Sequence, residues 1–138
     1  MIGNLEALEV INRQRYNFLK STCMENGGTI ADWKITNFLK DDLLSVQDFV
    51  DKSGLDISTL SRQVKRAVEK KLISRNKIEA DHRRTLFKIT EKGRLLKDEV
   101  NRQLDIYDQK LFENWSKEEL SMFNILINRV LKNALKMP

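Results

Sequence analysis

Apolar residues recur every three or four positions over most of the chain, which is the spacing that predicts amphipathic helices. The first helical segment runs from about 5 to 24, and Gly27-Gly28 lies beyond its end. Thr29 is followed three residues later by Asp32, the pattern of a helix-capping box. A second helix is therefore expected from about 30 to 40.

The next segment has the pattern of a helix-turn-helix. Ser45 begins a short helix, Gly54 supplies a tight turn, and Asp56 or Ser58 can cap a longer helix that runs to about Lys71. The apolar stripe of this longer helix faces away from a row of hydroxyl and basic side chains. The six candidates for contact with DNA on that row are Ser58, Thr59, Ser61, Arg62, Lys65 and Arg66.

The period then changes from helical to extended. Residues 72–78 and 85–89 read as two short strands, and the polar segment 79–84 between them reads as the tip of a hairpin. Helical spacing returns after Glu91 and continues for about twenty residues. A last helix is expected after Ser116, which has a glutamate three positions later.

Composition fits one soluble domain, because 138 residues with 41% hydrophobic and 33% charged side chains can form one core. The apolar runs are too short for a transmembrane helix or a secretory signal, so no membrane association is expected. Cys23 is the single cysteine, which favours a cytoplasmic location. No cofactor or metal site is expected, because histidine, cysteine and acidic residues do not cluster. We also expect no catalysis, because the one histidine has no nucleophile near it.

Positive charge is concentrated in the middle third of the chain. Residues 56–94 contain twelve basic and five acidic side chains, a net charge of +7, so the other residues together carry −2. Such a concentration of positive charge is expected where a protein contacts the phosphates of a nucleic acid. Arg62 is best placed to reach a guanine edge, whereas Lys65 and Arg66 are suited to phosphates. The alternative is an ordinary amphipathic helix with a solvated basic face, but the hairpin that follows favours a winged helix.

Several short motifs resemble the MarR (multiple antibiotic resistance regulator) family of bacterial repressors. They are Ser58-Thr59-Leu60-Ser61-Arg62, Leu72-Ile73-Ser74-Arg75, Asp81-His82-Arg83-Arg84, Ile89-Thr90-Glu91-Lys92-Gly93 and Trp115-Ser116-Lys117-Glu118-Glu119-Leu120. The resemblance implies that the wing residues Asp81, His82, Arg83 and Arg84 contact DNA, with Arg83 in the minor groove and Asp81 holding an arginine. One departure is Lys71, because similar proteins usually have glycine at that helix end. Another is Asp56, whose charge lies near phosphates.

The expected fold is mainly α-helical with a small β-hairpin wing, in a single domain covering 1–138. A winged helix-turn-helix lobe spans about 30–92, and segments 5–24 and 93–136 form dimerisation helices. The terminal helices carry more apolar surface than a winged helix of this size needs. The candidate interface residues are Leu5, Leu8, Ile11, Leu120, Phe123, Ile127, Val130 and Leu131. The alternative is that these residues pack inside one subunit.

The sequence thus predicts a transcriptional regulator, a repressor that binds a pseudo-palindromic operator in double-stranded DNA as a homodimer. An aromatic or amphipathic small molecule that binds in a cleft could release the protein from DNA. The candidate lining residues of that cleft are Tyr16, Phe18, Trp33 and Phe38, and core packing is the alternative role of these four side chains. A regulator without an effector is a second possibility. A third is a winged-helix module that binds a protein, which steep salt dependence of DNA binding would exclude.

Cys23 allows two interpretations. The resemblance includes family members that sense peroxide through a cysteine in the first helix. Cys23, however, is at the far end of that helix and has no second cysteine to resolve an oxidised form. The other interpretation is a partly buried thiol without a redox role.

Overall fold

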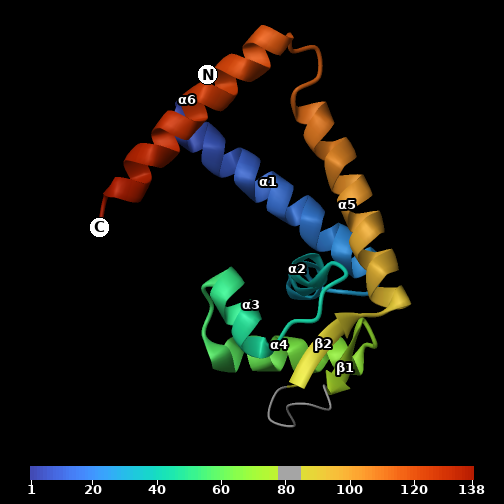
Figure 1. Cartoon of the computed structure of the whole chain (residues 1–138). Helices are drawn as coiled ribbons and strands as arrows, with labels where there is room; N and C mark the ends of the chain where they lie inside the picture. Colours follow the sequence, from blue (N-terminus) through green and yellow to red (C-terminus); the bar gives the residue numbers. More distant parts are fainter. Residues whose placement is uncertain (78–84) are drawn as a thin grey trace. The chain divides into compact units, whose positions relative to one another are not determined.

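The computed structural model describes residues 1–77 and 85–138. Six helices and one two-stranded antiparallel sheet occur in these ranges (Figure 1). In chain order they are α1 (Asn4–Glu25), α2 (Ile30–Leu39), α3 (Val46–Ser53), α4 (Ile57–Glu69), β1 (Ile73–Lys77), β2 (Thr85–Ile89), α5 (Glu91–Leu111) and α6 (Lys117–Lys136). The predicted mainly helical fold with a small hairpin is confirmed. Tertiary contacts group the residues into two compact units, Met1–Leu104 and Asp105–Pro138.

The capping residues read from the sequence determine where three of the helices begin. Reciprocal hydrogen bonds between the first capping residue and an acid three positions later are present at α2, α3 and α6. The pairs are Thr29 with Asp32, Ser45 with Asp48, and Ser116 with Glu119. Each box satisfies backbone N–H groups that have no partner within the first helical turn.

A core of nine buried residues joins α2, α3, α4 and the hairpin. Figure 1 shows these elements gathered at one end of the first unit. Phe49 of α3 is fully buried there, with its ring centroid 6.4 Å from that of Phe38 and 6.5 Å from that of Phe87. The backbone of Phe87 also exchanges two hydrogen bonds with Leu44, just before α3. The hairpin is therefore fixed to the helix-turn-helix by side chains and by backbone.

A second core joins the C-terminal half of α1 to α5. Its buried members are Leu19, Cys23, Leu72, Leu96, Val100 and Leu104. Polar side chains connect α2 to α5 beside it, because Trp33 donates its indole N–H to Asn101 Oδ1 at 2.8 Å and Asn101 donates to Asn37 Oδ1 at 3.0 Å. These bonds give the partly buried polar side chains partners and fix their positions.

The chain reverses sharply between α4 and β1. Lys71 has a φ of 64°, and the backbone N–H groups of Lys71 and Leu72 donate to the carbonyls of Val68 and Ala67. This is a Schellman motif, in which the left-handed residue is usually glycine. Lys71 therefore takes, without glycine, the left-handed conformation that this motif requires.

The same turn supports the start of α5. The Thr90 hydroxyl donates to the Lys71 carbonyl at 2.6 Å and accepts from the Gly93 N–H at 3.0 Å. Gly93 lies directly against the backbone of Leu72, and a Cβ built on Gly93 would overlap the Leu72 carbonyl oxygen. The Thr90-to-Gly93 motif thus has a structural role: threonine caps the helix, and glycine allows two backbones to approach closely.

The second unit contains the end of α5 and all of α6. Phe112, Trp115 and Phe123 pack edge to face, with ring centroids 5.1 to 5.5 Å apart. Helix α6 has no buried residue, although many of its side chains are apolar. In the described ranges, the helices are too short or too polar to cross a membrane.

Candidate nucleic-acid interface

Helices α3 and α4 form the helix-turn-helix that was expected from Ser45 onwards. Gly54 ends α3 in the left-handed conformation, with a φ of 73°, and its N–H donates to the Val50 carbonyl at 2.9 Å. Glycine adopts this conformation without steric cost, so the chain can turn directly into α4. The turn places the first residues of α4 at the surface.

Helix α4 has one buried and one exposed face. Leu60, Val64 and Ala67 are buried in the first core. Ser61, Arg62, Lys65 and Arg66 are all exposed, as is Ser58 in the first turn, whereas Thr59 is half-buried. No ion pair joins the three cations to another residue in the described ranges. Ile57 is apolar but 57% exposed, because it lies at the very start of the helix.

Asp56 is the residue that caps α4. Its carboxylate accepts from the Thr59 N–H at 2.8 Å and from the hydroxyls of Ser58 and Thr59 at 2.6 and 2.9 Å. These bonds, led by that from the Ser58 hydroxyl, lower the pKa of Asp56 to about 2. Both hydroxyls therefore have defined orientations, and a negative charge remains at the helix start at neutral pH.

The hairpin adds basic side chains beside α4. Arg75 on β1 and Lys88 on β2 are exposed, and the register pairs Arg75 with Phe87 and Ser74 with Lys88. The four predicted wing-tip residues, Asp81, His82, Arg83 and Arg84, lie outside the described residues. Their proposed contacts with DNA remain predictions.

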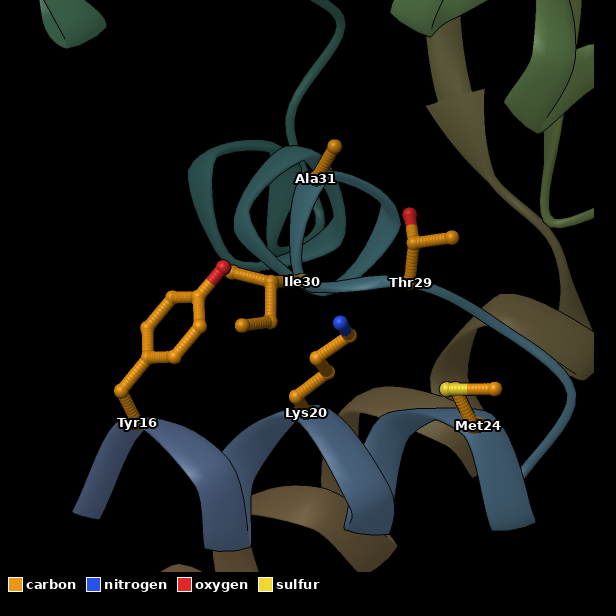
Figure 2. Close-up of a pocket in the computed structure, with 6 residues that line it drawn as sticks. All are labelled: Tyr16, Lys20, Met24, Thr29, Ile30 and Ala31. Atoms are coloured by element: carbon orange, nitrogen blue, oxygen red, sulfur yellow. The ribbon is translucent and has the colours of Figure 1, made fainter. Parts of the chain in front are cut away.

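A groove of about 250 Å³ lies between α1 and the start of α2. Figure 2 shows Tyr16, Lys20 and Met24 in a row on α1, with Ile30 opposite Tyr16 and Lys20; Thr29 and Ala31 complete the lining. The lining is mainly aliphatic and aromatic, with one ammonium group. Such a surface can bind the apolar part of a small molecule and interact with an acidic group on it.

The four aromatic residues predicted for an effector cleft do not lie together. Tyr16 lines the groove, while Phe18 and Trp33 pack against the second core and Phe38 against the first. Sequence reasoning missed the other lining residues of the groove. Lys20 and Met24 could have been found, because they lie four and eight positions after Tyr16 on one face of α1.

None of the eight predicted interface residues is buried in the structure. Leu8 and Ile127 are partly buried, and the other six are exposed: Leu5, Ile11, Leu120, Phe123, Val130 and Leu131. Leu5, Leu8 and Ile11 lie on α1, and the other five lie on α6. Each helix therefore presents apolar side chains that its own unit does not cover.

Cys23 is fully buried near the end of α1. Burial raises the pKa of its thiol to about 11, and the negative charge of Asp32 contributes in the same direction. The reactive thiolate is therefore scarce at neutral pH, which favours the interpretation of Cys23 as a thiol without a redox role.

Cys23 is expected to react with a disulfide reagent at pH 8 at least about a hundredfold more slowly in the folded protein than in urea. Stopped-flow thiol titration of the two states measures this ratio. Folding raises the pKa of the Cys23 thiol. Its contribution to the free energy of unfolding is therefore full below about pH 9 and is lost as pH rises towards 11. Rapid reaction of the folded protein would contradict the assignment.

The chain is similar to known proteins in both sequence and fold. No protein-family model matches the chain. Over 88 residues the chain is 42% identical to the "Uncharacterized HTH-type transcriptional regulator YxaD" of Bacillus subtilis, a match that covers 63% of this chain. It spans 61% of the length of that relative.

Solved structures share the fold over almost the whole chain. MepR, a transcription regulator of the Staphylococcus aureus multidrug efflux pump MepA, superposes with a TM-score of 0.79 at 18% identity, covering 96% of this chain and 99% of that one. A mutant MarR from E. coli complexed with operator DNA superposes with a TM-score of 0.71 at 20% identity, covering 91% of each chain. At these identities the likeness establishes the fold.

Proposed function

Since this chain has the winged-helix fold of the MarR regulators, we propose that it is a sequence-specific DNA-binding transcriptional repressor that acts as a homodimer. Its partner is double-stranded DNA, at a pseudo-palindromic operator. The observation that carries the proposal is the exposed face of α4, where Arg62, Lys65 and Arg66 project from a helix whose other face is fixed in the core. A helix of this kind fits the major groove of B-DNA.

The roles along α4 follow from position and chemistry. Arg62 follows the first turn of the helix and can donate two hydrogen bonds to one guanine. Lys65 and Arg66, a turn further on, neutralise phosphates and contribute affinity without sequence preference. The MarR variant with the same fold is complexed with operator DNA, which supports duplex DNA as the partner here. Arg83 is proposed to enter the minor groove from the wing.

Dimerisation is proposed to use the exposed apolar residues of α1 and α6. A two-fold axis would place two α4 helices about one turn of DNA apart, roughly 34–36 Å, and would match the symmetry of an operator. A small amphipathic acid in the groove beside Tyr16 and Lys20 is the proposed effector. Binding there would change the separation of the two α4 helices and release the DNA.

Arg62→Ala is expected to reduce operator affinity by about 1–3 kcal/mol and to relax sequence preference, because it removes a base contact. Lys65→Ala is the matched comparison on the same face. It should weaken operator and unrelated DNA alike and reduce the salt slope by about 0.9. Fluorescence anisotropy with DNA from upstream of the gene, across a salt series, measures both effects.

The same titration tests the function as a whole. Wild-type protein should bind two subunits per site, with log affinity falling by several units per decade of salt. Feeble binding at low salt that no substitution alters would overturn the DNA-binding proposal and favour a protein partner for the winged helix.

A further inference from the structure

Asp32 is a buried carboxylate that contacts more than its own helix. It is 2% exposed and lies in the first turn of α2. Its Oδ2 atom accepts from the Thr29 backbone N–H at 2.9 Å, which completes the helix cap. The same oxygen accepts from Lys70 Nζ at 2.7 Å. Lys70 is 38 residues away in sequence, so this second contact joins two elements of the fold.

Lys70 is the C-terminal capping residue of α4. Its carbonyl accepts from Lys92 Nζ at 3.0 Å, at the start of α5. The C-terminal end of α4 is thus held by α2 through the Lys70 ammonium and by α5 through the Lys70 carbonyl. The ammonium also lies where the negative end of the helix dipole favours a cation.

Asp32 needs the ion pair more than Lys70 does, because only Asp32 is buried. A buried carboxylate is costly unless it is paired and hydrogen-bonded, so Asp32 favours the arrangement in which Lys70 lies against it. Lys70 is 37% exposed and therefore has the freedom to turn to solvent if the carboxylate is neutralised. The pair can hold the end of α4, but removing its charge need not unfold the protein.

We propose that Asp32 is a positioning residue for DNA recognition: by holding Lys70, it fixes the orientation of α4 in which Arg62 meets the base edges. The inference rests on the proposed DNA-binding function. Base contacts tolerate only small errors of placement, about 0.5 Å and 10–20°, whereas phosphate contacts tolerate larger ones. Loosening the end of α4 therefore affects specific binding more than non-specific binding.

Asp32→Asn is the variant that tests this. Asparagine keeps an oxygen that can accept from the Thr29 N–H, but it lacks the charge that holds Lys70. We expect operator affinity to fall about three- to thirtyfold, while affinity for unrelated duplex DNA and the salt slope stay unchanged. Long-range electrostatics predicts the opposite sign, because removal of a negative charge would strengthen binding to both DNAs.

Lys70→Met and the double variant, Asp32→Asn with Lys70→Met, complete a double-mutant cycle. If the two residues act as a unit, Lys70→Met should lose as much operator affinity as Asp32→Asn, and the double variant should lose no more than either one. The double variant leaves no unpaired buried charge, so it carries the test if a single variant does not fold. Urea unfolding of each protein identifies conditions in which all are folded.

Asp41→Asn is the matched control. Asp41 pairs with Arg94 at 2.7 Å, the distance of the Asp32–Lys70 pair, but its side chain is exposed and the pair does not involve α4. Operator affinity should remain that of wild type. The inference is overturned if Asp32→Asn binds the operator as wild type does, or if Lys70→Met alone weakens both DNAs and reduces the salt slope. Absence of specific binding by wild-type protein would instead overturn the proposed function itself.

Discussion

Gly93→Ala is expected to destabilise the protein by about 3 kcal/mol or more, at the upper end of the cost of overpacking. The added methyl group would overlap the Leu72 carbonyl oxygen and lie 3.0 Å from Ile89 Cγ1. A flexible side chain could move aside, but Leu72 belongs to the backbone turn that joins α4 to β1. Relief therefore requires α5 to shift away from this turn, which would disturb the Thr90 cap and both cores.

Urea unfolding followed by circular dichroism measures this cost, and Gly3→Ala is its control. Gly3 precedes α1, has an ordinary φ of −65°, and a Cβ there would meet nothing within 4 Å. The control should unfold within about 0.5 kcal/mol of wild type. Equal midpoints for the two variants would show that the contact between Gly93 and Leu72 is not a close one in solution.

Val130→Glu is expected to convert the proposed dimer to monomers and to lower operator affinity by about 10²- to 10⁴-fold. Val130 is half-exposed on α6, within the apolar surface proposed to meet the second subunit. A buried glutamate without a partner would oppose association. Each monomer would then bind one half-site alone and lose the gain that two linked binding events provide. Light scattering after gel filtration gives the mass, and anisotropy gives the affinity.

Ser121→Glu is the matched substitution for this experiment. Ser121 is exposed on α6 nine residues before Val130, which places it on the opposite side of a helix with 100° per residue. The same charge there should leave the mass and the affinity near those of wild type. A dimeric Val130→Glu protein with wild-type affinity would contradict the proposed interface.

The sequence predicted the order and type of the elements because local signals determine them. The three capping boxes depend on residues three positions apart, and the turn at Gly54 depends on one glycine. The change from helical to alternating spacing after Lys71 predicted the hairpin. Such signals act over a few residues, so a single sequence displays them directly.

The parts that sequence reasoning missed depend on long-range packing. No spacing rule connects Asp32 with Lys70, because the fold alone brings these residues together. Aromatic character suggested a cleft lined by Phe18, Trp33 and Phe38, yet their rings pack against the two cores. An aromatic side chain in a core and one in a binding site have the same sequence signal, and only the surrounding elements distinguish them.

If α6 joins two chains as proposed, the concentration of the protein sets how many dimers form. Helix α6 has no buried residue in its own chain, and in the proposed dimer the second chain would cover its apolar side chains. When dimers are scarce, their number rises with the square of the chain concentration, so twice the synthesis gives about four times the dimer. Operator occupancy would then respond to synthesis more steeply than any monomeric regulator could, before any effector binds.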